Sequence, residues 1–271
     1  MKIGIGNGAF PLDWSFDKIF EKAAEIGFDG IELWLGETGP LNTSVTDEEL
    51  KEIKASADKH GIELYSIASG LGFGYSLADN DEAVREKSKG YIKQQLEIAN
   101  ALGCDTILVV PCVVTEEVDY ETAYNRAFDA MNELKPYAEK LGVSIGLENV
   151  WNKIFLSPLE LRDFIDKVGS DFVGSYFDVG NMILNGYAEQ WIKILGSRIK
   201  KVHIKDFKRN TAGETGFVGL FDGDVNFPAV MSALKEIGYD GWLTAELSIN
   251  PDYRWTCVEN ICRSMRAIAN S

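Results

Sequence analysis

The chain has 271 residues, 45% of them hydrophobic, which is enough to bury the core of one α/β barrel domain. Its 42 acidic and 27 basic residues give a formal net charge of -15, which argues against nucleic acid as a partner, because proteins engage phosphates through Lys and Arg. No apolar stretch approaches the length of a membrane-spanning helix, and the residues after Met1 enter a strand pattern without the regions of a signal peptide.

Short β-branched runs alternate eight times with longer stretches of helical periodicity. Strands are expected at residues 3–7, 30–34, 63–69, 106–112, 144–150, 173–178, 199–207 and 242–248. Helices are expected at residues 16–26, 47–59, 81–102, 120–141, 158–168, 188–195, 227–237 and 253–269. Eight strand–helix units without a linker predict one domain over residues 1–271, folded as a closed (β/α)8 TIM barrel.

Glycine follows many of the expected helices, where a left-handed C-terminal cap is needed. These glycines are Gly27, Gly61, Gly103, Gly142 and Gly238. An open doubly wound sheet also alternates strands and helices and is the alternative fold. It predicts a glycine-rich phosphate turn after the first strand, but Pro11 interrupts the helix start that such a turn requires. The barrel is therefore preferred.

The four cysteines have no spacing typical of a metal or redox site. They occupy positions 104, 112, 257 and 262, and no CxxC pair is present. Unpaired thiols are typical of a reducing compartment, so we expect a cytoplasmic protein.

Each of the last four expected strands carries, just after a run of strand-forming residues, a side chain that can bind a metal ion. These side chains are Glu148, Asp178, His203 and Glu246. Because the carboxyl ends of parallel barrel strands meet at one mouth, we expect the four to share one divalent cation. Each carboxylate alone could instead form a structural ion pair. Their occurrence together with one of only two histidines favours the metal site.

Three carboxylates and one imidazole form an oxygen-rich site that suits Mn²⁺ best, with Mg²⁺ or Co²⁺ as alternatives. Zn²⁺ is less favoured, because zinc prefers thiolates and more histidine. Glu148 and Glu246 also fit proton transfer. A metal that chelates a carbonyl and an adjacent hydroxyl stabilises an enediolate, and a carboxylate on each face can remove and return the carbon-bound proton.

Basic residues gather at the end of the seventh expected strand and directly after it, at Lys205, Lys208 and Arg209. A solvated basic surface is one interpretation of this segment. In the other, Arg209 or a neighbouring lysine such as Lys205 binds a substrate hydroxyl or phosphate. Aromatic residues at strand ends, among them Trp151, are candidates for the pocket wall.

Together these segments resemble the xylose-isomerase-like barrel superfamily of sugar-phosphate isomerases and epimerases, which includes ketose 3-epimerases. The matching segments are residues 146–149 with Trp151, 178–181, 202–206 and 245–246, in the family's order. The resemblance implies that Glu148, Asp178, His203 and Glu246 bind the metal. It further implies that Glu148 and Glu246 are the acid–base pair and that Arg209, six residues after the histidine, contacts the substrate.

Two positions depart from the pattern of tagatose-type epimerases. Those enzymes carry a histidine three residues after the metal-binding aspartate and a second glutamate six residues after the first metal-binding glutamate. Here Asn181 and Ile154 occupy these positions. We therefore expect Asn181 to contact the substrate and a phosphorylated or shorter ketose to be more attractive than a free ketohexose.

The leading hypothesis is a divalent-metal-dependent 3-epimerase of a ketose or ketose phosphate. The sequence is also compatible with a homo-oligomer. An aldose–ketose or hydroxypyruvate-type isomerase and an inosose-type dehydratase begin with the same proton abstraction, and the sequence does not separate them. A DNA-repair endonuclease with a trinuclear zinc cluster needs more than this chain's two histidines. A non-catalytic sugar-binding barrel needs neither glutamate base.

Overall fold

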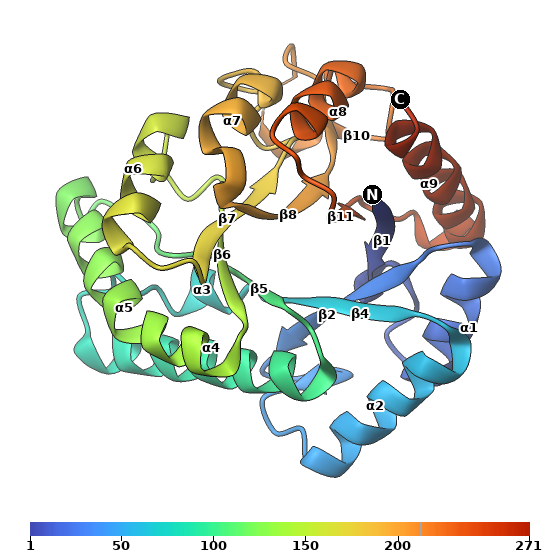
Figure 1. The fold of residues 1–271 in the computed structure, drawn as a ribbon, viewed down its shortest axis with the longest axis horizontal. Coiled ribbons are helices and arrows are strands. Elements are labelled where there is room, and N and C mark those ends of the chain that lie inside the picture. Colours follow the sequence, from blue (N-terminus) through green and yellow to red (C-terminus); the bar gives the residue numbers. More distant parts are fainter. Residues whose placement is uncertain (212) are drawn as a thin grey trace.

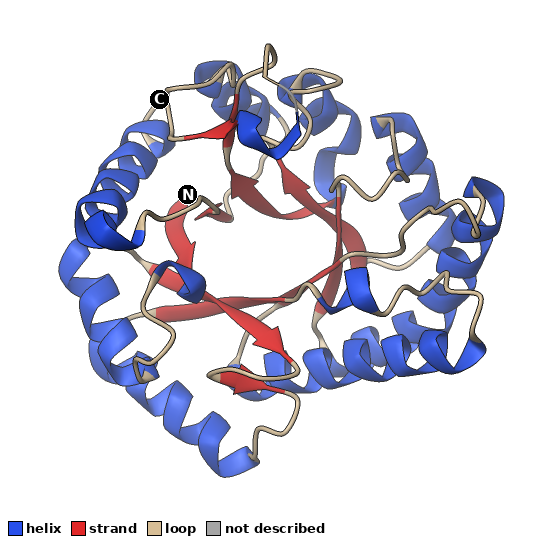
Figure 2. Ribbon diagram, turned by 180° about the vertical axis from the view of Figure 1, so that it is seen from behind, coloured by secondary structure: helices blue, strands red, loops and turns tan. Residues whose placement is uncertain are grey.

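The computed structural model describes residues 1–211 and 213–271. Eight parallel strands close into a barrel, and the helices surround it (Figure 1). Around the barrel the strands follow the order β1, β2, β4, β5, β6, β7, β8 and β11, and β11 pairs with β1 to complete the ring. The view from behind shows the same ring of strands inside the helices (Figure 2). The predicted (β/α)8 TIM barrel is confirmed.

The barrel strands are β1 (Lys2–Gly6), β2 (Gly30–Gly36), β4 (Glu63–Ala68), β5 (Thr106–Val109), β6 (Ser144–Glu148), β7 (Val173–Asp178), β8 (Ile199–Ile204) and β11 (Trp242–Ala245). The longer helices are α1 (Phe16–Ile26), α2 (Asp47–His60), α4 (Glu82–Leu102), α5 (Tyr120–Leu141), α6 (Pro158–Val168), α7 (Ala188–Leu195), α8 (Phe227–Glu236) and α9 (Arg254–Ala269). Shorter elements are β3 (Leu41–Asn42), α3 (Leu71–Gly74), β9 (Asp206–Phe207) and β10 (Phe217–Val218).

The helices end where the glycine signals predict. Gly27, Gly61, Gly103 and Gly142 adopt left-handed conformations with φ of 105°, 67°, 81° and 68°. This conformation, which glycine adopts without steric cost, stops each helix and starts the turn into the next strand. These turns are short, so most of the irregular chain lies in the loops that follow the strands.

Several barrel strands are shorter than the sequence predicts. Residues 110–112, which were expected in β5, and residues 246–248, which were expected in β11, lie outside regular pairing. The expected strand at residues 199–207 is split, because β8 ends at Ile204 and, after Lys205, residues Asp206–Phe207 form β9, which pairs antiparallel with β10. The loop after β8 thus carries a small hairpin of its own over the barrel mouth.

Side chains alternate between the barrel interior and the helix layer. On β7, Phe177 packs against Trp191 of α7, while Tyr176 and Asp178 belong to the opposite face of the strand. The interior near Tyr176 is apolar on one side, where Ala68, Leu108 and Val110 are packed against it. Within the described residues, no helix is both long and apolar enough to cross a membrane.

Candidate metal and active site

Four potential metal ligands meet at the carboxyl ends of four adjacent strands. Glu148 ends β6, Asp178 ends β7, His203 lies in β8 and Glu246 directly follows β11. The register pairs Asp178 with His203 across β7 and β8. One ligand atom from each of the four side chains lies within 4.8 Å of all the others. The structure therefore brings together the four residues that the sequence analysis singled out.

The distances within this cluster centre on His203. Its Nδ1 lies 2.6 Å from Glu246 Oε2, 3.9 Å from Asp178 Oδ2 and 4.0 Å from Glu148 Oε1. Among the described residues, Asp178 Oδ2, His203 Nδ1 and Glu246 Oε2 are buried without a hydrogen-bond partner, so the 2.6 Å contact lacks hydrogen-bond geometry. Buried polar atoms are normally paired. A divalent cation would satisfy these three atoms at once, and the donor set suits such an ion.

The charges of the cluster are costly in this buried place. Burial and the neighbouring charge of Glu246 raise the pKa of Glu148 to about 8. Burial likewise raises the pKa of Asp178, although Lys205 opposes that effect. Burial also acts on Glu246, but its contacts with His203 and Lys205 outweigh this and hold its pKa well below the usual range. Added positive charge at the cluster would therefore stabilise the ionised carboxylates.

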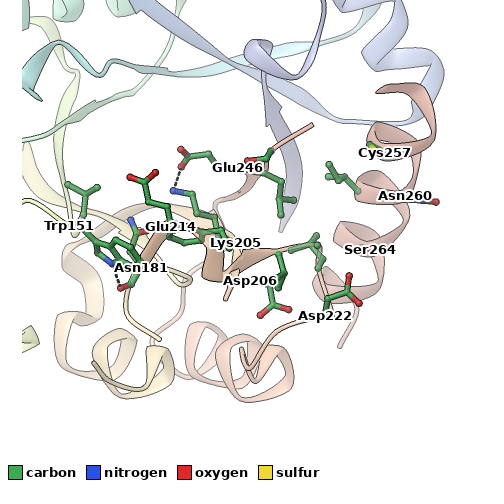
Figure 3. Close-up of a pocket in the computed structure, with 18 of the residues that line it drawn as sticks. Trp151, Asn181, Lys205, Asp206, Glu214, Asp222, Glu246, Cys257, Asn260 and Ser264 are labelled. Carbon is green, nitrogen blue, oxygen red and sulfur yellow. Dashed lines mark hydrogen bonds and ion pairs between the residues drawn. The ribbon is translucent and has the colours of Figure 1, made fainter. Parts of the chain in front are cut away.

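Lys205 supplies a positive charge beside the cluster. Its Nζ lies 3.0 Å from Glu246 Oε2 and 3.2 Å from Asp178 Oδ2, and Figure 3 shows it beside Glu246 in the pocket. Burial lowers the pKa of Lys205, but the neighbouring carboxylates, Asp178 first, outweigh burial and raise it above the usual value. Gly180 permits the close approach of this residue, because a Cβ there would lie 2.5 Å from Lys205 Cβ.

Two asparagines connect the ligands to one another. Asn149 joins the ends of β6 and β7, because its Nδ2 donates to the carbonyl of Asp178 at 2.8 Å and its Oδ1 accepts from the Asp178 amide at 2.9 Å. The backbone N–H of Asn181 donates to Asp178 Oδ1 at 2.8 Å, and the side-chain Nδ2 of Asn181 lies 3.5 Å from Glu148 Oε1. Trp151 Nε1 donates to the Asn181 carbonyl at 3.0 Å. These contacts orient the aspartate and place Asn181 beside Glu148.

A pocket of about 890 Å³ opens over Glu246 and Lys205. Three of the predicted substrate-binding residues, Trp151, Asn181 and Lys205, line it. Trp151 lies on one side of the pocket, and Cys257, Asn260 and Ser264 of α9 lie on the other (Figure 3). The loop after β8 contributes Glu214, Phe217, Leu220 and Asp222. Of the four proposed metal ligands, Glu246 lines this space, which can hold a small molecule.

Arg209, which the family resemblance implies as a substrate contact, makes its hydrogen bonds with the segment after β7. Its Nε donates to the carbonyl of Ile183 at 2.9 Å, and one terminal nitrogen donates to that of Gly186 at 3.0 Å. Its guanidinium lies 4.7 Å from the centre of the Tyr187 ring. Arg209 therefore braces the segment after β7, and it is not among the described residues that line the pocket. Ile154, which occupies the position of the second glutamate of tagatose-type epimerases, is buried in the hydrophobic core.

Glu32 on β2 contacts the cluster but was not singled out in the sequence. It is 4% exposed, and its Oε1 lies 2.9 Å from His203 Nε2. The available signal was a carboxylate within the otherwise apolar run of residues 30–34. A buried carboxylate is costly unless it is paired, so an acidic residue in such a strand indicates a buried partner for it.

Comparisons with known proteins agree with this architecture. The model of the xylose isomerase-like TIM barrel family matches residues 20–258. L-ribulose 3-epimerase of Methylomonas sp. (strain DH-1) is 28% identical over 254 residues, which cover 88% of this chain and 83% of that protein. Fructoselysine 3-epimerase of Escherichia coli O157:H7 is 23% identical over 255 residues, with coverage of 91% and 90%.

Among solved structures, D-psicose 3-epimerase in the presence of D-fructose superimposes with a TM-score of 0.84 at 22% identity, over 100% of both chains. These three related proteins are sugar epimerases by name, and the likeness to the solved structure extends over the whole barrel. The family model covers most of the chain. The chain belongs to the xylose isomerase-like TIM barrel family.

Proposed function

We propose that this protein is a divalent-metal-dependent epimerase that inverts carbon 3 of a ketose, with Mn²⁺ as the metal ion. One observation carries the proposal: Glu148, Asp178, His203 and Glu246 offer ligand atoms within 4.8 Å of one another beside a pocket. Three of these atoms are buried without hydrogen-bond partners among the described residues, and two of the three form ion pairs with Lys205. The names of the related 3-epimerases support the choice of reaction.

When bound, a divalent cation supplies positive charge that stabilises the negative charge developing on substrate oxygens as a proton is removed. The other tasks fall to the chain's own residues. Glu148 and Glu246 stand at the two ends of the arc formed by β6, β7, β8 and β11. They therefore approach a sugar from opposite sides, and one can remove the proton from carbon 3 while the other returns a proton to the opposite face.

Lys205 and the pocket lining shape the proposed substrate. Lys205 is the basic side chain among the described lining residues, and it is already paired with Asp178 and Glu246. Its remaining donor capacity can bind a substrate oxygen. Glu214 and Asp222 are acidic and exposed on the same lining. Since these charges repel a phosphate, the lining favours an unphosphorylated sugar, a change from the sequence-based preference.

A cytoplasmic location is part of the proposal. Its support is that the four cysteines, Cys104, Cys112, Cys257 and Cys262, are free thiols, as is typical of proteins in reducing compartments.

The test is a panel of ketoses and ketose phosphates incubated with the Mn²⁺-loaded protein in deuterated water and followed by NMR. Deuterium incorporation at carbon 3 with appearance of the epimer supports the proposal. Aldose formation indicates an isomerase instead, and loss of a hydroxyl group indicates a dehydratase. Absence of exchange with every sugar in the panel contradicts the proposed function.

A further inference from the structure

We infer that Glu32 is a positioning residue of the proposed metal site. It holds the His203 ring so that Nδ1, and not Nε2, faces the cation. This inference rests on the proposed function, because it concerns a ligand of the proposed metal. It starts from the two ring nitrogens of His203. Nε2 lies 2.9 Å from Glu32 Oε1, whereas Nδ1 faces Glu246, Asp178 and Glu148.

The contact with Glu32 selects one tautomer of His203. A carboxylate oxygen accepts hydrogen bonds, so the Nε2 atom that faces it carries the proton and donates. A neutral imidazole with a proton on Nε2 has its free lone pair on Nδ1, which is the form that binds a metal ion. The negative charge of Glu32 also makes that lone pair more basic.

Glu32 is itself held through its second carboxylate oxygen, Oε2. Ser66 Oγ donates to Glu32 Oε2 at 2.6 Å, and the Tyr176 hydroxyl donates to the same oxygen. The two hydroxyl oxygens lie 3.0 Å apart. All four side chains are buried, and they come from four different barrel strands, β2, β4, β7 and β8. Both carboxylate oxygens are therefore fixed, and the position of Oε1 relative to His203 is fixed with them.

The position of this network in the barrel favours a role beyond packing. Burying a carboxylate is costly even when it is paired, and well-packed apolar residues often serve stability equally well. The same barrel interior does contain such packing, where Ala68, Leu108 and Val110 contact Tyr176. The Glu32 carboxylate instead contacts His203, the one imidazole of the ligand cluster.

The experiment is a Mn²⁺ titration that measures free Mn²⁺ by electron paramagnetic resonance. Glu32→Gln keeps the shape of the side chain and an acceptor oxygen but removes the charge, and it should weaken Mn²⁺ binding by about 10- to 100-fold. Tyr176→Phe keeps Glu32 and removes one of its donors, and it should weaken binding measurably, by a factor of up to about ten. Glu63→Gln is the matched control, because Glu63 is exposed at the start of β4, at the opposite end of the barrel.

A spectroscopic reading checks the tautomer directly. The chain has only two histidines, so long-range ¹H–¹⁵N spectra of Mg²⁺-loaded, ¹⁵N-histidine-labelled protein can be assigned with a His60→Gln variant. His203 should show a proton on Nε2 in the wild type. Melting curves of the metal-free variants verify that each is folded.

A proton on Nδ1 in the wild type would overturn the inference, as would wild-type Mn²⁺ affinity in both folded variants. If Glu32→Gln does not fold, Tyr176→Phe alone decides, and unchanged affinity in that variant overturns the inference. Failure of the wild type to bind any divalent ion would instead overturn the proposed function, so the two failures are distinguishable.

Discussion

Replacing Asp206 with asparagine should loosen the loop that forms one wall of the pocket. Asp206 is buried at the start of β9, and its carboxylate accepts three backbone amides. Oδ1 accepts from Phe207 at 2.9 Å and from Val225 at 3.1 Å, and Oδ2 accepts from Gly223 at 2.9 Å. The two later amides end the loop that begins after β9, so one side chain closes the loop at its base.

The structure sets the size of this effect. Asparagine keeps one acceptor oxygen but turns the other into a donor, which then faces the N–H of Gly223. One charge-assisted hydrogen bond is lost, worth about 1.5–3 kcal/mol, and the other two bonds become neutral and weaker. We expect a total of about 3 kcal/mol, a large part of it as local opening of the loop rather than global unfolding.

Hydrogen exchange followed by NMR measures this opening residue by residue. Protection of the Gly223 and Val225 amides should fall by about 100-fold, since about 1.4 kcal/mol corresponds to a factor of ten. Asp222→Asn is the matched control, because Asp222 is exposed in the same loop and its replacement should change stability by less than about 0.5 kcal/mol. Unchanged protection at both amides in the Asp206 variant would refute the reasoning.

Three further predictions concern stability and reactivity. Arg209→Ala should lower the melting temperature, because it removes the hydrogen bonds to the carbonyls of Ile183 and Gly186, and should leave KM nearly unchanged; a raised KM at wild-type stability would restore Arg209 as a substrate contact. Burial raises the pKa of Glu148 from 4.5 to about 8, so the folded metal-free protein binds this proton more tightly than the unfolded chain does. Its stability should therefore fall as the pH rises between about 5 and 8, and Mn²⁺ should reduce that slope; melting curves that are flat with pH in a chelator contradict this. Burial raises the pKa of the Cys112 thiol to about 12, so this thiol should react with a disulfide reagent only after unfolding, and rapid labelling at Cys112 itself in the native protein, located by peptide mass spectrometry, would contradict this.

The sequence predicts most of the fold because its signals are local. Helix α6 begins and ends where predicted, since Ser157 caps its start, Pro158 occupies its first turn and Gly169 ends it in a left-handed conformation. The division of the expected strand at residues 199–207 was not predictable in the same way. Phe207 pairs with Phe217, and the apolar character of a short strand does not reveal which partner it finds.

The candidate site follows the same division between local and distant information. Glu148, Asp178 and His203 lie at or next to the ends of β6, β7 and β8, so the barrel fold alone places them at one mouth. Glu32 makes its contact with a residue 171 positions away, which no local pattern predicts. The resemblance implies that Arg209 contacts the substrate, and its position six residues after the histidine does not predict its hydrogen bonds to the carbonyls of Ile183 and Gly186.

The central claim is that Glu148 and Glu246 act on opposite faces of one sugar beside one metal ion. Deuterium exchange at carbon 3 of each epimer, measured by NMR with Glu148→Gln and with Glu246→Gln at verified full metal occupancy, tests it most directly. Each variant should lose net epimerisation yet still exchange the carbon-bound hydrogen of one epimer, and the two variants should differ in which epimer that is, because each epimer presents its proton to only one glutamate. Loss of exchange for both epimers in either variant would contradict the two-base account and favour a single-base reaction at this site.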